Sequence, residues 1–282
     1  MVKFGPSGNS EKFYDLGYKD SEQAPEWLHS MGLTAYEYSF TLGRFISEEK
    51  SKAIREQAEK NNIQISVHSP YYINFCNPTD VAKENSFKYL LNSLLGARML
   101  GGKYAVVHMG SIMKMERKEA FSILEKNFKD FLQIFYDQGL EGTIIAPETM
   151  GKYSNIGTVD EVLEIASWDK SVIPTFDFGH INCITQGALK TKQDFLDIFN
   201  KAIDKLGFEK IDRCHIHFSK IKYGPKGEIA HLTFKDNEYG PQYEPFLQSV
   251  KELKINPVII SESRGTQADD ALTMKKYFDT LK

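Results

Sequence analysis

Six of the seven histidines in this chain of 282 residues lie at the end of an extended apolar run or in the loop that follows one. Acidic residues end three further runs of the same kind. In chain order the residues are His68, His108, Glu148, Asp177, His180, His215, His217, His231 and Glu262. Side chains from the ends of many successive strands converge on one point only if the strands are parallel and closed into a ring. The pattern therefore predicts a site for several metal ions at the mouth of a barrel.

Extended runs alternate with amphipathic helical stretches along the whole chain. The expected strands are 2–5, 34–40, 64–69, 104–110, 142–148, 172–178, 213–219 and 257–263, and the expected helices lie near 22–31, 48–61, 80–100, 116–138, 158–168, 190–206, 241–253 and 266–281. Such alternation fits either a closed barrel or an open doubly wound sheet. An open sheet builds its site at one switch point, whereas six runs here supply polar residues. We therefore predict an α/β fold, a (β/α)8 TIM barrel in which residues 1–282 form one domain.

Composition limits the other classes of protein. The three cysteines, Cys76, Cys183 and Cys214, form no CxxC pair, so we expect a reducing, cytoplasmic location without disulfides or a zinc knuckle. No run approaches the roughly 20 apolar residues of a membrane span, and the first residues show no signal-peptide pattern. We expect neither a membrane nor an obligate protein partner. The net charge of −3 argues mildly against a protein that coats nucleic acid by charge alone.

The residue types indicate the chemistry. Zinc and manganese bind imidazole nitrogen and carboxylate oxygen, and a carboxylate can bridge two ions. Five or six imidazoles with at least three carboxylates exceed what one ion needs, so we expect two or three ions about 3.5–4 Å apart. That arrangement suits hydrolysis of a phosphodiester.

His29, in a helical stretch, is expected to be structural, and Glu37 could be an inward-facing strand residue in an ion pair. His215 and His217 alternate by two, so both face the same side of their strand.

At these residues the chain resembles a divergent member of the endonuclease IV family of apurinic/apyrimidinic (AP) endonucleases, within the xylose isomerase-like TIM barrel superfamily. The resemblance covers about residues 60–265, and its segments occur in the family's order. They are VHSPYYINF, VVHMGS (with methionine in place of proline), PETMGKYSNIG, FDFGH, CHIHFSK and SES. Each segment alone is a weak signal, but six in the correct order are specific.

The resemblance implies two or three Zn²⁺ ions, with Mn²⁺ as an alternative. The implied ligands are His68, His108 and Glu148 for the first ion, Glu148, Asp177, His215 and Glu262 for the second, and His180, Glu228 and His231 for the third. Glu148 and Glu262 are the implied catalytic residues, and Glu262 would help to polarise the attacking water. His215 is preferred over His217 because it lies five residues before Lys220, as in the family, where the position of His217 is normally asparagine.

Two segments depart from the family pattern. The family has Asp-Arg-His at the third metal, whereas this chain has Glu228-Ile229-Ala230-His231, which is one residue longer and lacks the arginine. The N-terminal GPSGN stands where the family usually has a His-Val-Ser strand end. These differences predict a divergent branch of the family.

The resemblance implies a metal-dependent phosphodiester hydrolase that cleaves DNA on the 5′ side of abasic sites in base excision repair. Its partner would be double-stranded DNA with abasic or damaged sites, contacted by Tyr71, Tyr72 and Lys220. Aromatic wedges and basic loops are what such binding requires. The basic residues of the expected mouth loops are Arg44, Lys114, Arg117, Lys118, Lys152, Lys220, Lys222, Lys226 and Arg264.

Two alternatives stay open. A sugar isomerase or epimerase of the same superfamily moves a proton beside a carbonyl with a single divalent metal. Such enzymes resemble this chain at Glu148, Asp177, His215 and Glu262, and often at His180, but do not need His68, His108 and His231 together. A barrel that binds a metal or ligand without catalysis is the other alternative, and it leaves the density of ligands unexplained.

Overall fold

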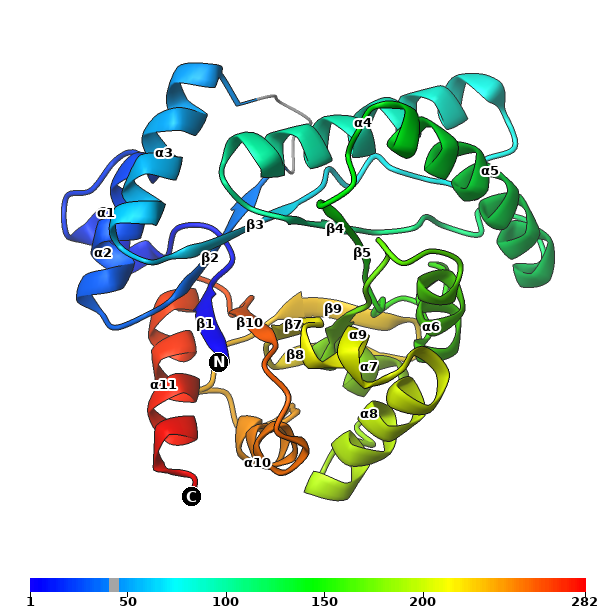
Figure 1. Cartoon of the computed structure of the whole chain (residues 1–282). Helices are drawn as coiled ribbons and strands as arrows, with labels where there is room; N and C mark the ends of the chain where they lie inside the picture. Colours follow the sequence, from blue (N-terminus) through cyan, green and yellow to red (C-terminus); the bar gives the residue numbers. More distant parts are fainter. Residues whose placement is uncertain (41–45) are drawn as a thin grey trace.

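Parallel strands form the centre of the structure, a computed structural model that describes residues 1–40 and 46–282 (Figure 1). Arg44, one of the basic residues assigned above to the mouth, lies outside the described residues. Eight strands of the described chain are parallel to their neighbours: β1 (Lys3–Pro6), β2 (Ala35–Ser39), β3 (Gln64–His68), β4 (Tyr104–Val107), β5 (Ile144–Pro147), β6 (Thr175–Asp177), β7 (His215–Phe218) and β10 (Val258–Ser261).

The strands pair in two sets, in the orders β1-β10-β7-β6 and β2-β3-β4-β5. Isolated parallel bridges join the sets at both seams. Ser7 pairs with Glu37 between the ends of β1 and β2, and Glu148 pairs with Thr175 between β5 and β6. The ring is therefore closed, which confirms the predicted TIM barrel and brings the carboxyl ends of all its strands to one mouth.

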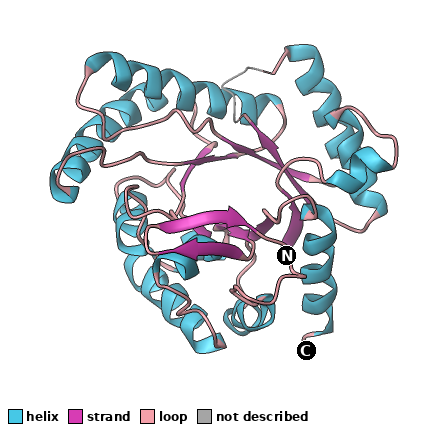
Figure 2. Ribbon diagram, turned by 180° about the vertical axis from the view of Figure 1, so that it is seen from behind, coloured by secondary structure: helices cyan, strands magenta, loops and turns pink. Residues whose placement is uncertain are grey.

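Helices enclose the ring of strands (Figures 1 and 2). The outer layer contains α2 (Ala24–Ser30), α3 (Glu48–Lys60), α4 (Asp80–Met99), α5 (Arg117–Asp137), α6 (Val159–Ser167), α8 (Lys192–Leu206), α10 (Tyr243–Leu253) and α11 (Gln267–Thr280). Helix α5 shows why these stretches are helical, because Leu124, Phe128 and Phe131 recur at helical spacing and form a buried face. Phe128 and Phe131 pack against Phe75, which follows β3.

Local hydrogen bonds set the helix starts that the sequence indicates. Ser47 caps α3 by accepting a hydrogen bond from the Lys50 N–H, and Thr158 forms a capping box with Glu161 at the start of α6. The structure adds short helices at α1 (Glu11–Asp15), η1 (Ser21–Gln23), α7 (Phe178–Ile184) and α9 (Phe208–Asp212).

The connection between β7 and α10 contains an antiparallel hairpin of β8 (Ile221–Gly224) and β9 (Gly227–His231). The hairpin is attached to the loop after β5, because the Glu228 N–H donates to the Gly151 carbonyl at 2.8 Å. Gly227 has a φ of +100°, and a Cβ there would lie 2.2 Å from the same carbonyl oxygen. This attachment carries Glu228 and His231 to the barrel mouth.

Within residues 1–40 and 46–282, we find no helix with the length and apolar content needed to cross a bilayer.

Candidate metal centre

A cavity of about 410 Å³ opens at the barrel mouth, where the polar strand ends meet. Its lining combines imidazoles and carboxylates with an aromatic ring and one lysine. The lining residues are His68, Tyr71, His108, Met150, Lys152, Asn155, His180, Glu228, His231 and Glu262. The convergence that the strand-end pattern predicts is therefore present in the described chain.

Glu148, at the end of β5, lies at the centre of this cluster and is fully buried. Its Oε2 atom lies 3.0 Å from His108 Nε2 and 3.4 Å from His68 Nε2. Its Oε1 atom lies 2.9 Å from His217 Nδ1. Zinc ligands in a tetrahedral site are about 3.3 Å apart, given metal–nitrogen distances near 2.0–2.1 Å. The atoms around Glu148 Oε2 have the spacing of a ligand group.

A second group of potential ligands contains Glu148, Asp177, His217 and Glu262, each with one ligand atom within 4.8 Å of the others. The Glu262 Oε1 atom lies 3.5 Å from His217 Nδ1. Because Glu148 belongs to both groups and directs one oxygen to each, it has the geometry of a bridging carboxylate.

The structure corrects the choice between the two histidines of β7. His217, and not His215, lies beside Asp177 and Glu262. His215 is two residues earlier on the strand, which places it about 6.6 Å deeper in the barrel at about 3.3 Å per residue. There its Nε2 atom lies 2.8 Å from Glu37 Oε2. The spacing to Lys220 was a misleading guide, because depth along the strand decides which ring reaches the mouth.

A third group contains His180, Glu228 and His231. Glu228 Oε2 lies 3.4 Å from His180 Nε2, and Glu228 Oε1 lies 3.7 Å from His231 Nε2. His180 is on α7, which the sequence pattern did not predict. Asp177 caps this helix by accepting a hydrogen bond from the His180 N–H at 2.7 Å. The cap ends β6 at Asp177 and directs His180 to the cavity one turn later.

Backbone carbonyls set the tautomers of two of these rings. His68 Nδ1 lies 2.8 Å from the Ser69 carbonyl oxygen, and His180 Nδ1 lies 2.9 Å from that of Thr149. A carbonyl oxygen only accepts, so in the neutral ring Nδ1 carries the proton and Nε2 has a free lone pair. Hydrogen bonds of this kind orient histidines that bind metals.

The donor atoms fit divalent cations. Buried Glu148 Oε2 and Asp177 Oδ2 have no hydrogen-bond partner among residues 1–40 and 46–282. The 3.0 Å approach of His108 to Glu148 lacks hydrogen-bond alignment. Buried carboxylate oxygens without partners are costly, and a cation bound by both groups would remove that cost.

Burial and charge act against each other in this cluster. Burial alone would raise the pKa of Glu148, but the charges of His217 and His108 hold it well below its ordinary value. At Asp177 burial dominates and, despite His180, raises the pKa to about 6. Burial would lower the pKa of His180, but the neighbouring Asp177 carboxylate raises it to about 10. Without cations, protons on the imidazoles balance the carboxylates.

Gly151 leaves the room that the third group needs. A Cβ at this position would lie 2.6 Å from His180 Cδ2 and 3.0 Å from Glu228 Cβ. We expect Gly151→Ala to remove one metal equivalent per chain, measured by elemental analysis, because two of the three ligands must move apart. Gly224→Ala, on the hairpin that carries Glu228 and His231, is the control, since its Cβ would meet only Ile229 at 3.4 Å. Equal metal content in the two variants would contradict the assignment.

The expected DNA contacts differ in their placement. Tyr71 lines the cavity, and its ring centroid lies 5.4 Å from that of His68 and 5.2 Å from that of His108. Tyr72 is 59% exposed and packs against Tyr89. Lys220 is only 3% exposed, and its Nζ donates to the carbonyls of Phe234 and Asp236. Its expected contact with DNA is therefore corrected: Lys220 secures the loop after β9.

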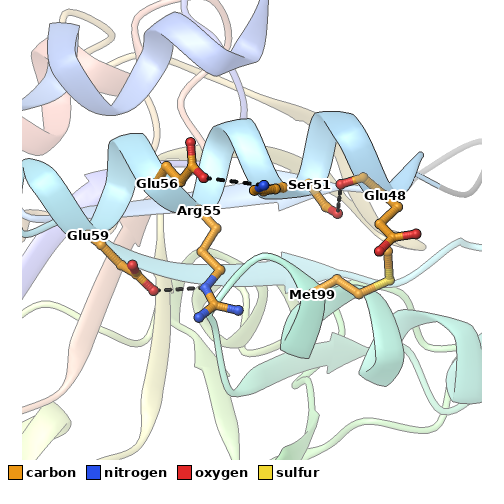
Figure 3. Close-up of a pocket in the computed structure, with 7 residues that line it drawn as sticks. Glu48, Ser51, Arg55, Glu56, Glu59 and Met99 are labelled. Carbon is orange, nitrogen blue, oxygen red and sulfur yellow. Dashed lines mark hydrogen bonds and ion pairs between the residues drawn. The ribbon is translucent and has the colours of Figure 1, made fainter.

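Other candidates have structural roles. Arg117 pairs with Glu161 at 2.6 Å and donates to the carbonyls of Tyr153 and Asn155, so it holds the loop after β5 in place. A second hollow, of about 620 Å³, lies on the outer side of α3 next to Met99 (Figure 3). Exposed i,i+4 ion pairs such as Arg55–Glu59 line it, and none of the potential ligand groups found among residues 1–40 and 46–282 lies there.

Comparison with known proteins agrees with this geometry at the level of the family. The model of the xylose isomerase-like TIM barrel family matches residues 25–280. An uncharacterized protein of Methanocaldococcus jannaschii is 29% identical over 279 residues, covering 98% of this chain and 97% of that protein. A protein named probable endonuclease 4 from Mycoplasmoides gallisepticum is also 29% identical over 279 residues, covering 90% of this chain and 88% of that protein.

Solved structures of two activities share the fold. Endonuclease IV from Thermus thermophilus has a TM-score of 0.68 at 17% identity, with 99% of this chain and 100% of that chain covered. The 3-keto-D-glucoside 4-epimerase from E. coli has a TM-score of 0.70 at 13% identity, with both chains fully covered. At these identities the likeness shows the fold alone. With a family model that spans residues 25–280, the chain belongs to the xylose isomerase-like TIM barrel family, and its distant relatives include proteins named endonuclease 4.

Proposed function

We propose that this protein is a metal-dependent phosphodiester hydrolase of the endonuclease IV type, which cleaves DNA on the 5′ side of abasic sites. The observation that carries the proposal is the Glu148 carboxylate, which directs one oxygen to each of two ligand groups. The third group, His180, Glu228 and His231, lies on the same cavity. Three adjoining groups exceed the needs of a one-metal reaction and suit a phosphate that gains charge as it is attacked.

The residues of the cavity have separate roles in this proposal. Zn²⁺ or Mn²⁺ held by the three groups would neutralise phosphate charge and lower the pKa of water. Glu262 lines the cavity and accepts a proton from the attacking water while the water oxygen forms a bond to phosphorus. The bond from phosphorus to the 3′ oxygen then breaks, and the departing oxygen takes a proton from solvent to become the 3′-hydroxyl. Lys152 supplies positive charge at the rim, and the half-exposed Tyr71 provides a face against which a flipped sugar packs.

The number of bound ions and the fate of an abasic strand test the proposal together. We expect protein purified without chelator to contain two or three zinc or manganese ions per chain by elemental analysis. We also expect it to cut a duplex with one abasic site, leaving a 3′-hydroxyl, and to leave the matched undamaged duplex intact. A fully loaded protein that leaves the abasic strand whole would rule out this function.

A one-metal epimerase is the second candidate. The group of Glu148, Asp177, His217 and Glu262 supplies four ligands by itself, which is enough for one divalent ion. The fold, which the E. coli epimerase and the Thermus endonuclease IV both share, is compatible with this candidate as well. One ion per chain, together with epimerisation of a ketose and no incision, is the result that would select it.

A further inference from the structure

A fully buried carboxylate lies beneath the metal centre, inside the barrel. Glu37 is on β2, and its partners His215 and His217 are on β7. Glu37 Oε1 lies 3.1 Å from His217 Nε2, and Glu37 Oε2 lies 2.8 Å from His215 Nε2. Since β2 and β7 are not neighbours in the ring, these contacts cross the barrel interior.

Stability alone does not account for a charge at this position. A carboxylate moved from water into a dry interior loses several kcal/mol of solvation free energy. Contacts with its partners compensate for this loss but add no large net stability. Apolar side chains of similar volume often stabilise an interior as well or better. This barrel accommodates such side chains on the neighbouring strand β10, where the fully buried Ile260 is in register with His217. The contacts of Glu37 therefore point to a task other than packing.

The two oxygens of Glu37 have different surroundings. Oε2 receives the Ser66 hydroxyl at 3.0 Å as well as His215 Nε2, and these two contacts fix the orientation of the carboxylate. Oε1 thereby lies beside His217 Nε2 at 3.1 Å, but without hydrogen-bond alignment. Neither Oε1 nor His217 Nε2 has a hydrogen-bond partner in the described part of the chain.

The other nitrogen of His217 faces the metal centre. His217 Nδ1 lies 2.9 Å from Glu148 Oε1 and 3.5 Å from Glu262 Oε1. His217 thus connects Glu37 on one side with the second ligand group on the other. A carboxylate that accepts the distal N–H of a histidine fixes its tautomer and its ring orientation, and so leaves the near nitrogen free to bind a cation.

We propose that Glu37 is a positioning residue for the metal-loaded centre. In the structure His217 Nδ1 donates to Glu148 Oε1; when a cation replaces that proton, Glu37 Oε1, 3.1 Å from Nε2, accepts the Nε2–H and so presents the Nδ1 lone pair to the group of Glu148, Asp177 and Glu262. Ser66 and His215 orient Glu37 for this task. The proposal rests on the metal centre proposed above and does not depend on which reaction that centre performs.

Competition between the protein and a zinc chelator tests this role. We expect Glu37→Gln to lower the affinity for one zinc ion per chain about 10–100-fold, the range for loss of such a partner. The affinities for the other ions should stay unchanged. Glu164→Gln, the same change in an exterior ion pair with Lys205, is the matched control and should leave the zinc affinities unchanged. His215→Gln is a comparison variant, because it removes one of the two groups that orient Glu37 but leaves Ser66 and the contact of Oε1 with His217. We expect at most a few-fold loss for it.

A second readout uses the wild-type protein and needs no variant to fold. In the zinc-loaded protein, long-range ¹H–¹⁵N spectra should show His217 with a proton on Nε2 and none on Nδ1. A proton on Nδ1, or zinc affinity in Glu37→Gln within about twofold of wild type, would overturn the proposal. So would loss of one whole equivalent in both Glu37→Gln and His215→Gln, which would place a cation in the Glu37, His215 and His217 group instead. Wild-type protein that binds no metal would contradict the metal centre itself.

Discussion

Glu148→Gln is expected to lower the rate of incision at an abasic site by roughly a thousandfold or more, the upper range for loss of one charged or polar group from an active site. The change removes the negative charge that both ligand groups share, because one oxygen faces His68 and His108 while the other faces His217. We expect metal content to fall by at least one equivalent as well. Single-turnover cleavage of a labelled abasic duplex, combined with elemental analysis of the same sample, measures both effects.

Glu164→Gln on α6 is the matched control for this prediction. Glu164 is paired with Lys205 on the exterior, so the same chemical change should leave rate and metal content at wild-type levels. Stability of the two variants can be compared by thermal unfolding. Incision by Glu148→Gln within tenfold of wild type would contradict the bridging role and with it the proposed hydrolase.

The metal-free protein is expected to lose stability as the pH rises, while the metal-loaded protein does not. Burial opposes the charge of His68 and His180, but Glu148 raises the pKa of the first to about 9 and Asp177 raises that of the second to about 10. In the unfolded chain both titrate near 6.5. The folded protein therefore holds more protons between these values, and its extra stability, complete below about pH 6.5, disappears as the pH approaches 9–10. Each retained proton contributes a slope of about 1.4 kcal/mol per pH unit.

Cations at the same groups replace those protons, so the slope should vanish when metal is bound. Each ion at a thousand times its Kd adds about 4 kcal/mol to the free energy of unfolding. Urea denaturation between pH 6.5 and 9, with and without chelator, measures both quantities. His180→Gln in the metal-free state should reduce the slope, whereas Glu164→Gln should not, because Lys205 holds the pKa of the Glu164 carboxyl below its ordinary value, far from this pH range. Parallel curves with and without chelator would show that the imidazoles do not exchange protons for metal.

Much of the fold was accessible from local patterns. The predicted strands and helices correspond to the elements of the barrel because apolar periodicity and caps such as Ser47 and Thr158 act over a few residues. The short helix α7 was missed, since FDFGH reads as the end of an extended run until Asp177 is seen to cap the turn that follows. The hairpin of β8 and β9 lies between the predicted strand 213–219 and the predicted helix 241–253, among residues to which the sequence pattern assigned no element.

In the candidate site too, some features follow from the sequence and others only from the tertiary structure. The sequence by itself determined which ligand types reach the barrel mouth, because residues at the ends of parallel strands in a closed ring must share one rim. It did not determine depth or contacts across the interior. Only the tertiary structure decided that His217 faces the second ligand group while His215 lies below it, that Glu37 contacts both, and that Lys220 is buried. Those outcomes depend on how distant strands face one another across the barrel, and spacing along one strand carries no record of that arrangement.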